Sequence, residues 1–265
     1  MILRSVMRHV RDQNWVAVWI DFLIVVVGVF IGIQVANWNE AQAERRLGLD
    51  YEDRLVVDLQ KDLRMLRGMV SYYQEVLNSV LAAQQMLSDD SGQATQLIKN
   101  AYRASEINYN PQTRATWDQI VSSGHIGLLP REATPLIAEY FAFDFARDAY
   151  TELFSSDYRK RIRSLIPLSV QIDIRANCSD IRAPTGVIIG LNVDCELGMD
   201  TDPVTATQIA ERIRRAPDLL ADLTYQYSHV YSAAINSQGL VVQVEQALTA
   251  LGHAPEHDVE RSEGP

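Results

Sequence analysis

The first pattern along the chain is an apolar segment bounded by tryptophans. Between Trp15 and Trp38 the residues are mostly apolar, and Phe22 to Ile33 form an unbroken apolar run. As a helix, the 24 residues from Trp15 to Trp38 would span about 36 Å, slightly more than the roughly 30 Å hydrocarbon core of a bilayer. Trp15, Trp19 and Trp38 would lie near the headgroups, where amphipathic rings are favoured. The pattern predicts a transmembrane anchor.

Two other interpretations of this segment stay open. A buried helix of a soluble protein can be as apolar, although Val- and Ile-rich runs flanked by Trp are unusual there. A cleaved signal peptide would use Arg4, Arg8 and Arg11 as its basic leader and Ala41-Gln42-Ala43 as its cleavage site. Because a long polar stretch separates the apolar run from that site, we favour an uncleaved anchor.

Charge and cysteine usage indicate which side of the membrane holds the bulk of the chain. Three arginines precede the span, whereas Arg45 and Arg46 follow it, which gives a small bias towards an N-terminus inside. Cys178 and Cys195 lie in one short, irregular segment, which suits a disulfide in an oxidising compartment. Two reduced thiols are the alternative; a structural zinc site would need four ligands.

Two glycines inside the apolar segment suggest a contact between helices. Gly28 and Gly32 form a G-x-x-x-G pattern, which lets two helix backbones approach closely in a membrane. Glycine is also common in membrane helices without any such contact. We therefore expect either a homodimer or a protein partner through this helix or through the amphipathic helix that follows.

The residues after the apolar segment predict a long amphipathic helix that ends near Ser88. Apolar positions recur at spacings of three and four, as in a coiled coil or an antiparallel bundle. We call these positions the seam: Leu55, Leu59, Leu63, Leu66, Val70, Tyr73, Leu77, Val80 and Leu87. Gly48 and Gly68 are possible weak points of the helix, and the turn cluster 88–92 ends it.

Further helices follow at 94–104 and 112–121, with Gly124 as a stop signal. The next predicted helix starts after Pro130 and continues to about Leu165. Its apolar stripe is interpreted as core packing: Ile137, Tyr140, Phe141, Phe145, Tyr150, Leu153, Phe154 and Tyr158. The cations at its end, Arg159, Lys160, Arg161 and Arg163, suit a helix C-terminus; a patch for anionic lipid or phosphate is the alternative.

Alternating residues then indicate a small hairpin. Apolar and polar residues alternate over 170–175 and over 187–193, which predicts two strands closed by the cysteine pair. Asp202 and Pro203 are typical of a helix start, and this helix should end near Arg215. A last long helix should run from Pro217 to Leu251.

Together these patterns predict an all-α fold: a transmembrane helix continuing into a long amphipathic helix, then an extracytoplasmic helical bundle with a small disulfide-closed loop or hairpin. The expected divisions are a cytoplasmic N-terminus (1–14), the span (15–38), the helical domain (39–253) and a polar tail (254–265).

Composition narrows the function classes. The 265 residues carry 24 Lys and Arg against 34 Asp and Glu, a formal net charge of −10. An acidic chain without a basic block argues against nucleic acid as a partner. The mean hydropathy is near zero, which excludes a multi-span transporter but not a single span. No sequence motif for a cofactor or catalytic metal is found, and we expect none.

Three groups of polar residues are candidates for chemistry, and each has a simpler explanation. Ser122, His125 and Asp118 are close in sequence, but triads usually join residues distant in sequence, so a turn and capping role is favoured. His253 and His257 lie in the tail and are expected to face solvent. The acidic loop, which is interpreted as solvated rather than calcium-binding, contains Asp194, Glu196, Asp200 and Asp202.

Two stretches resemble an uncharacterised bacterial protein family. Residues 28–40, ending in Asn37-Trp38-Asn39-Glu40, are similar to that family's membrane-exit segment. Residues 116–129 are similar to a second family stretch with a Ser-Gly pair, and Tyr140-Phe141 stand where members have paired aromatics. The chain departs from the pattern at 35–37 and in the cysteine segment. The resemblance implies a single-pass anchor and a helical domain, and no activity.

The resulting hypothesis is a non-enzymatic interaction or scaffold protein, anchored in the inner membrane and binding lipid and a protein partner. The first alternative is an extracytoplasmic ligand sensor that signals through a membrane partner, for which a bundle pocket lined by Arg and aromatic residues would speak. An envelope enzyme is the less favoured alternative, and it predicts a cleft that brings His125 or the acidic loop against distant polar residues.

Overall fold

The computed structural model describes residues 15–184, 186–192, 195–197 and 203–255 of the chain. The described residues are mostly helical, as the periodicity predicted. The chain divides into two compact units, Met1–Asp50 and Tyr51–Pro265, which are described separately below.

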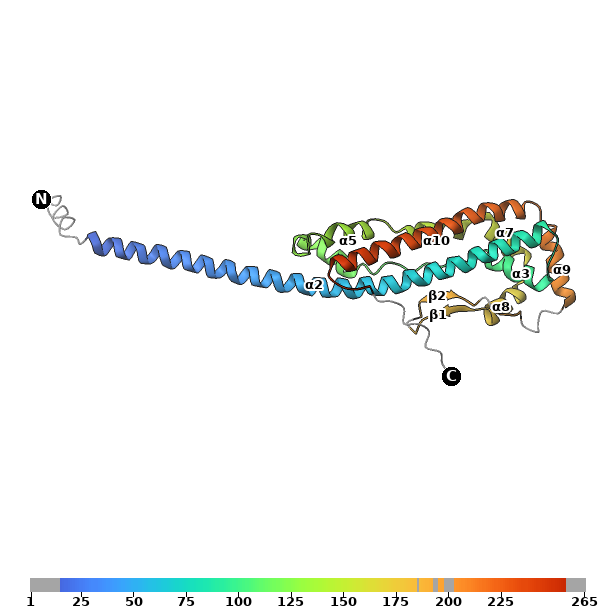
Figure 1. Cartoon of the computed structure of the whole chain (residues 1–265), viewed down its shortest axis with the longest axis horizontal. Coiled ribbons are helices and arrows are strands. Elements are labelled where there is room, and N and C mark those ends of the chain that lie inside the picture. Colours follow the sequence, from blue (N-terminus) through green and yellow to red (C-terminus); the bar gives the residue numbers. More distant parts are fainter. Residues whose placement is uncertain (1–14, 185, 193–194, 198–202, 256–265) are drawn as a thin grey trace. The chain divides into compact units, whose positions relative to one another are not determined.

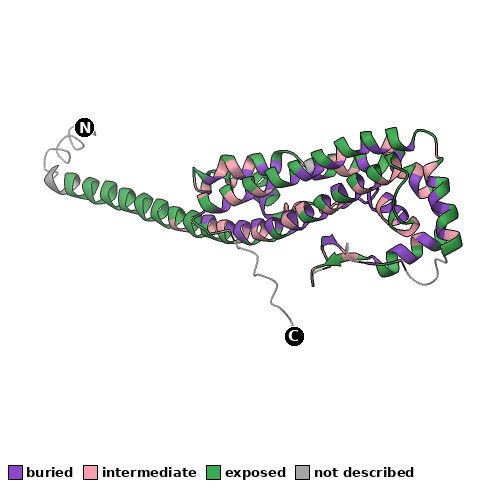
Figure 2. Ribbon diagram, turned by 45° about the vertical axis from the view of Figure 1, so that its right-hand side comes forward, coloured by how far each residue is buried: buried purple, intermediate pink, exposed green. Residues whose placement is uncertain are grey.

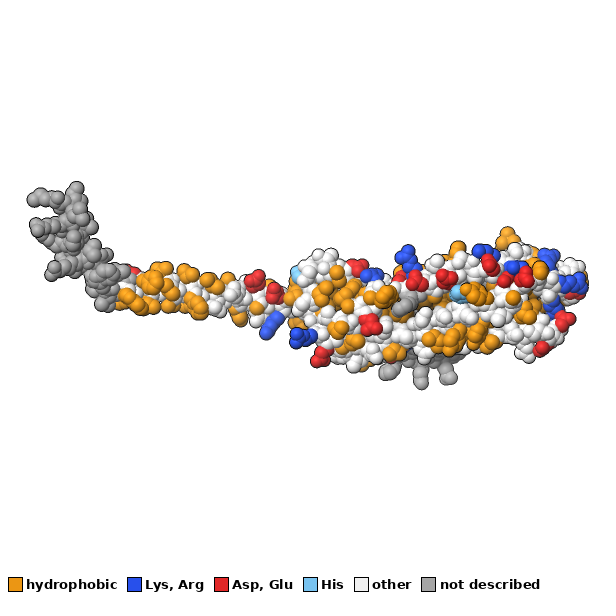
Figure 3. Space-filling view, turned by 90° about the horizontal axis from the view of Figure 1, so that it is seen from above, with side chains coloured by type: hydrophobic (Ala, Val, Ile, Leu, Met, Phe, Trp, Pro, Cys, Tyr) orange, Lys and Arg blue, Asp and Glu red, His pale blue; other side chains and the backbone are white. Residues whose placement is uncertain are grey.

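The described part of the first unit is the beginning of helix α2 (Trp15–Ser88), which continues into the second unit. From Trp19 to Trp38 every large apolar side chain is at least 42% exposed. Hydrophobic side chains therefore cover most of this segment (Figure 3), in which Asp21 is the one charged residue. In this segment the apolar residues do not follow one helix face, in contrast to the seam.

The second unit holds the rest of α2 and all other elements (Figure 1). Its helices are α3 (Ala94–Arg103), α4 (Ala115–Ser122), the 3-10 helix η1 (His125–Leu128), α5 (Ala133–Ala142), α6 (Phe145–Ser155), α7 (Asp157–Leu165), α8 (Leu168–Asn177), α9 (Pro203–Arg214) and α10 (Leu219–Ala250). Strands β1 (Asp180–Arg182) and β2 (Ile188–Leu191) form one antiparallel hairpin.

The core of this unit forms along the seam. Leu55, Leu59 and Leu63 are fully buried, and the outward-facing Val57 is 64% exposed (Figure 2). Helix α10 runs antiparallel to this part of α2 and packs against α5, α6 and α7. Helix α3 packs against α9 and α7. Seven of the nine seam positions are buried, whereas Val70 and Leu87 are half-buried, so the seam predicted most of the buried face of α2.

The long helix expected up to Leu165 is wrong in one respect, because the chain forms three helices there. Asp144 and Ser156 interrupt it, and each accepts a hydrogen bond at the start of the next helix, from Arg147 N at 3.0 Å and Arg159 N at 3.2 Å. Such N-caps satisfy backbone donors that a helix start leaves unpaired. One expected core residue, Phe154, is 57% exposed, and the side chain of Phe145 lies outside the described residues.

The hairpin exists, but its first arm was placed wrongly. Residues 168–177 form helix α8 rather than a strand, since Val170 and Ile174 are buried four residues apart and Ile172 between them is 60% exposed. The paired residues are Asp180 with Leu191 and Ile181 with Gly190, so the strand that pairs with β2 follows Cys178. Part of the expected second arm, Val193, lies outside the described residues.

Gly68 allows the hairpin to lie directly against α2. A Cβ atom at this position would come within 2.8 Å of the Ile189 Cα atom. Only a residue without a side chain permits this backbone approach. Gly68 is therefore a packing position, although the sequence suggested a weak point of the helix.

Candidate functional site

The apolar part of α2 carries all the residues expected to form the anchor. Trp19, Phe22, Ile33 and Trp38 are 63%, 63%, 52% and 66% exposed. Trp15 begins the helix, and its side chain lies outside the described residues. No part of the most apolar window of this helix is buried, and among the described residues it is the one helix long and apolar enough to cross a membrane.

Gly28 and Gly32 lie within this segment, one turn apart. A Cβ atom added at either position would meet no atom within 4 Å. Within the first unit these two glycines leave a surface on which another helix could approach closely.

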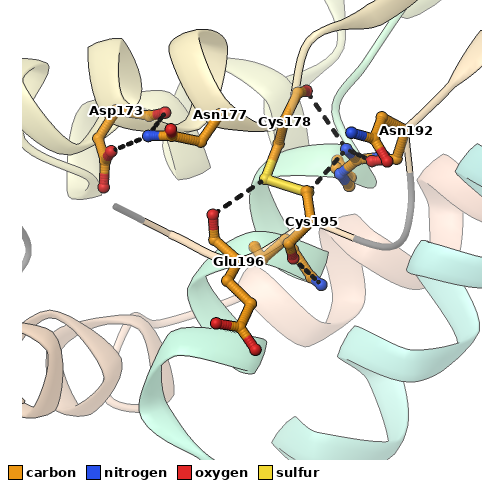
Figure 4. Close-up of a disulfide and its surroundings, with 8 residues drawn as sticks. Asp173, Asn177, Cys178, Asn192, Cys195 and Glu196 are labelled. Carbon is orange, nitrogen blue, oxygen red and sulfur yellow. Dashed lines mark hydrogen bonds between the residues drawn. A yellow bond between two sulfur atoms is a disulfide. The ribbon is translucent and has the colours of Figure 1, made fainter. Parts of the chain in front are cut away.

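The cysteines form the expected disulfide, which joins the end of α8 to the segment after β2 (Figure 4). The Cα atoms are 5.3 Å apart, and both residues are at least 93% buried. Beside Cys178, Asn177 Nδ2 donates to Asp173 Oδ1 at 2.5 Å. Lys99 Nζ of α3 donates to the Cys195 carbonyl oxygen at 2.8 Å, so α3 holds the closed loop in place.

Arg103 at the end of α3 fixes the same loop from inside. Its Nη2 donates to the carbonyl oxygens of Cys178 (3.3 Å) and Asn192, and lies 3.3 Å from Cys195 Sγ. The residue is 2% exposed, and burial lowers the pKa of its guanidinium. Its Nε and Nη1 have no hydrogen-bond partner among the residues that the structure describes. The loop carbonyls thus accept from a cation that is almost entirely removed from water.

A second charged group, the arginine–glutamate cluster, lies next to Arg103 and consists of Tyr102, Glu106, Arg163 and Arg175. Glu106 Oε2 is 2.9 Å from Arg175 Nη2 and 3.6 Å from Arg163 Nη2. Burial raises the pKa of Glu106, although both arginines act against this shift. Arg163 also lies over the Tyr102 ring, 4.1 Å from its centroid, and donates to the Tyr102 hydroxyl at 2.7 Å.

Most of the cations predicted at the end of the long helix make contacts within the domain, although α7 begins at Asp157, so Arg159 and Lys160 lie in its first turn and not near its C-terminus. Arg159 donates to the Ser105 carbonyl oxygen, and Arg161 pairs with Asp222 at 2.7 Å and donates to the Pro217 carbonyl oxygen at 2.7 Å. Lys160 makes an exposed pair with Asp157 at 3.5 Å. The cations are used to join α7 to the segment after α3 and to the start of α10.

The sequence interpretation missed a buried carboxylate within the seam. Asp62 is 0% exposed and accepts from Thr113 N at 3.1 Å, Thr113 Oγ1 at 2.6 Å and the Tyr140 hydroxyl at 2.8 Å. Burial raises its pKa, although these hydrogen bonds oppose the shift. One acid between Leu59 and Leu66 on an otherwise apolar face was the available signal.

The residues considered for catalysis do not act together. His125 Nδ1 is 3.0 Å from the Tyr51 hydroxyl, Ser122 donates to the Gln119 carbonyl oxygen at 3.1 Å, and Asp118 pairs with Arg114 at 3.3 Å. Gly124 adopts φ of 72°, as expected for a turn. These contacts match the turn and capping interpretation.

The remaining candidates are only partly described. His257, Asp194, Asp200 and Asp202 lie outside the described residues, so the acidic loop and the histidine pair stay untested. Within the described part of the chain, no group of three or more His, Cys, Asp and Glu side chains could hold a metal ion.

A hollow with a volume of about 660 Å³ lies where α7, α9 and the start of α10 meet. Its lining includes Arg161, Arg212 and Arg215. Arg212 donates to the Leu165 carbonyl oxygen at 3.4 Å, and Arg215 pairs with Glu211 at 3.2 Å. The arginines therefore serve helix ends, where cations are favourable without any ligand.

A family model for a family of unknown function (DUF6090) matches residues 21–164, more than half of the chain. The chain belongs to this family. The DUF6090 match begins within the apolar part of α2 and ends in α7, so it includes Asp62, Arg103, Glu106 and Arg163. The cysteine hairpin and α10 lie beyond it.

Membership of DUF6090 agrees with the expectation of an uncharacterised family, and it assigns no activity. Both stretches that carried the resemblance, 28–40 and 116–129, lie inside the matched residues. The searches of curated proteins and of solved structures gave no match.

Proposed function

We propose that the chain is a single-pass protein of the bacterial inner membrane whose extracytoplasmic helical domain is an interaction or scaffold module. Residues 15–38 are the anchor, residues 1–14 lie in the cytoplasm, and the domain from residue 39 onward lies outside. The observation that carries the proposal is the exposure of the whole apolar segment on all sides of its helix.

The exposure of the apolar segment favours the anchor over the soluble alternative. A core helix of a soluble protein is mostly buried, whereas this window has no buried residue. Leaving a Val, Leu, Ile or Phe side chain in water costs about 1.5–3 kcal/mol relative to burying it. Lipid removes this cost around the whole circumference of the helix, whereas a protein partner on one side would remove it only on that side.

Two observations support an extracytoplasmic domain. Arg4, Arg8 and Arg11 precede the segment, in line with the preference of cytoplasmic flanks for cations. The Cys178–Cys195 disulfide suits an oxidising compartment. A cleaved signal peptide would place the domain on the same side, so the state of the N-terminus must be measured directly.

The interaction role is supported by how the polar residues are used. The buried charges of the second unit join helices and the hairpin to one another, as Arg103 and Glu106 do. Ser122 and His125 are engaged in separate contacts. Long helices meanwhile expose broad faces to partners, and Gly28 and Gly32 offer one such face within the anchor.

Carbonate extraction of membranes from cells that produce the full chain tests the anchor. We expect the protein to stay in the pellet, with an intact mass that starts at Met1. Release into the supernatant, or a mature chain that starts at Glu44, would contradict it.

Two further measurements test the extracytoplasmic location. Peptide mapping without reductant should show Cys178 joined to Cys195. A reporter that is active only in the cytoplasm should be silent when fused after Pro265.

Purification of the tagged full chain from a mild detergent extract tests the interaction role. We expect a protein partner, or a second copy of the chain, to remain in constant ratio through washing. Recovery of the monomeric chain alone at every protein concentration would contradict a scaffold.

A further inference from the structure

Helix α10 contains a long stretch without charge. From Leu223 to Val244, 22 residues in sequence, there is no Asp, Glu, Lys or Arg, in a chain that is 22% charged. The stretch would be about 33 Å long at 1.5 Å per residue. A helix face towards solvent usually carries charged residues, so this stretch requires an explanation.

The charges at both ends of the stretch are neutralised within the chain. Asp222 pairs with Arg161 of α7 at 2.7 Å, and Glu245 pairs with Arg67 of α2 at 2.9 Å. The face between them is therefore bordered by ion pairs that are already formed, rather than by single charges available to a charged partner.

One exposed sector of this stretch carries large apolar and aromatic side chains. Tyr227, Tyr231, Ile235 and Val242 are 38%, 48%, 48% and 46% exposed. At 100° per residue they fall in one sector of about 80° around the helix. Leu220, 40% exposed, lies in the same sector just before the stretch. We call these five residues the α10 face. Thr224 and Gln238 are exposed in the same sector, so polar, uncharged side chains lie among these residues. Single exposed apolar residues are ordinary, but several on one helix face mark an interaction site.

We propose that the α10 face binds the α10 face of a second copy of the chain, around a two-fold axis near Tyr231 and Ile235. The net charge of −10 makes two copies repel each other, and this repulsion is smallest across a surface that carries no charge. A two-fold contact places the same patch on both partners, so an uncharged, aromatic patch is compatible with itself. Depletion of charge and enrichment of Tyr also characterise the centres of protein interfaces.

The size of the face fits a contact that depends on proximity. The area that one helix face of about 33 Å length can bury is smaller than the roughly 800 Å² per partner of a typical stable interface. Two copies held in one bilayer have an effective concentration in the millimolar range, on the order of that for short linkers, which allows a smaller contact to be occupied. This step rests on the proposed membrane anchor, whereas the choice of the face does not.

Cysteine cross-linking of the full chain in membranes tests the contact. Tyr231→Cys and Ile235→Cys should each give a covalent dimer with a short thiol cross-linker. Val57→Cys and Leu81→Cys, which are 64% and 54% exposed on α2, should not. The native cysteines are oxidised and buried and do not contribute. Equal dimer yields at all four positions, or cross-links only to another protein, would overturn the proposal.

Charge substitutions at the centre of the face test self-association without disturbing the fold. Ile235→Asp and Ile235→Lys should each weaken dimerisation at least about tenfold, because two like charges would meet at the axis. The two variants mixed together should form a heterodimer again. A dimer that persists in Ile235→Asp, or a mixture that stays monomeric, would contradict the proposal.

The outcomes separate this inference from the membrane anchor. Cross-links through α10 in a chain that carbonate releases would leave the dimer in place and remove the anchor. Full retention in the membrane without α10 cross-links would support the anchor and overturn the α10 contact.

Discussion

The two ends of helix α2 both carry many apolar side chains but arrange them differently. Between Trp19 and Trp38 the apolar residues surround the helix and all are exposed. From Leu55 onward most of them recur every three or four residues, and most residues of that face are buried. The comparison shows that periodicity, in addition to hydrophobic content, distinguishes a helix that packs on one face against protein from one that needs an apolar environment all around.

Polar residues follow the same division. The second half of α2 contains Asp62, whose hydrogen bonds come from a different part of the chain. In the described residues of the first half, the large apolar side chains are exposed, and a Cβ atom added at Gly28 or Gly32 would meet no atom within 4 Å. The buried half of the helix is thus specified by tertiary contacts, and the exposed half by its composition alone.

The largest expected effect is on core packing. Leu63→Ala should lower the free energy of unfolding of the helical domain by about 2–5 kcal/mol, because it leaves a cavity at a fully buried position. Denaturant titration of the full chain in detergent, followed by near-UV circular dichroism, measures this. Phe30→Ala, at a residue 61% exposed, is the control, and an equal loss there would remove the distinction between the two halves.

The second prediction concerns a charge placed in the exposed, apolar half of α2. Val29→Lys should make membrane insertion less favourable by about 2.5–3.5 kcal/mol, because a charge is then placed near the centre of the apolar segment. The fraction of chain that resists carbonate should fall, and domain unfolding should stay unchanged. Val57→Lys, on the exposed side of the second half, should leave both unchanged; a loss of insertion there would contradict the division of α2.

Local patterns accounted for the long helices but not for where the chain bends or pairs. The seam is visible because residues three and four apart share a face, and this needs no knowledge of the partner. Asp144 and Ser156 cap the starts of α6 and α7, but the apolar stripe continues across them and concealed both breaks. Val170, Ile172 and Ile174 alternate like a strand, but the tertiary structure buries only the first and last of them.

The polar core was the least predictable part. Arg103 and Glu106 flank a turn, and nothing in their local sequence differs from surface charges. Their burial depends on Arg175 and on the carbonyls of the cysteine loop, which lie 69 or more residues further along the chain. The disulfide was predictable, in contrast, because two cysteines in one irregular segment allow one pairing.

Two glycines on α2 give a matched pair of intermediate effect. Gly68→Ala should cost about 1–3 kcal/mol of unfolding free energy, because the new Cβ atom would lie 2.8 Å from the Ile189 Cα atom and the hairpin would have to move. Gly28→Ala meets no atom and should leave thermal unfolding of the domain unchanged. If Gly68→Ala is stabilising, as Ala is in an ordinary helix interior, the close approach of the hairpin is not maintained in solution.

The smallest expected effect concerns pH and the one acid of the seam. Burial raises the pKa of Asp62 in the folded chain, so the folded state holds this proton more tightly than the unfolded state does. Its contribution to stability is therefore complete below the ordinary carboxyl pKa and is lost as the pH rises through the raised value.

Asp62→Asn should remove this decline in stability. The difference between the two pH–stability curves separates the contribution of Asp62 from that of Glu106, whose raised pKa acts in the same direction. Asp53→Asn, at an exposed position on the same helix, is the control. A difference curve for Asp62→Asn that is flat, or that rises with pH, would mean that the hydrogen bonds from Thr113 and Tyr140 outweigh burial.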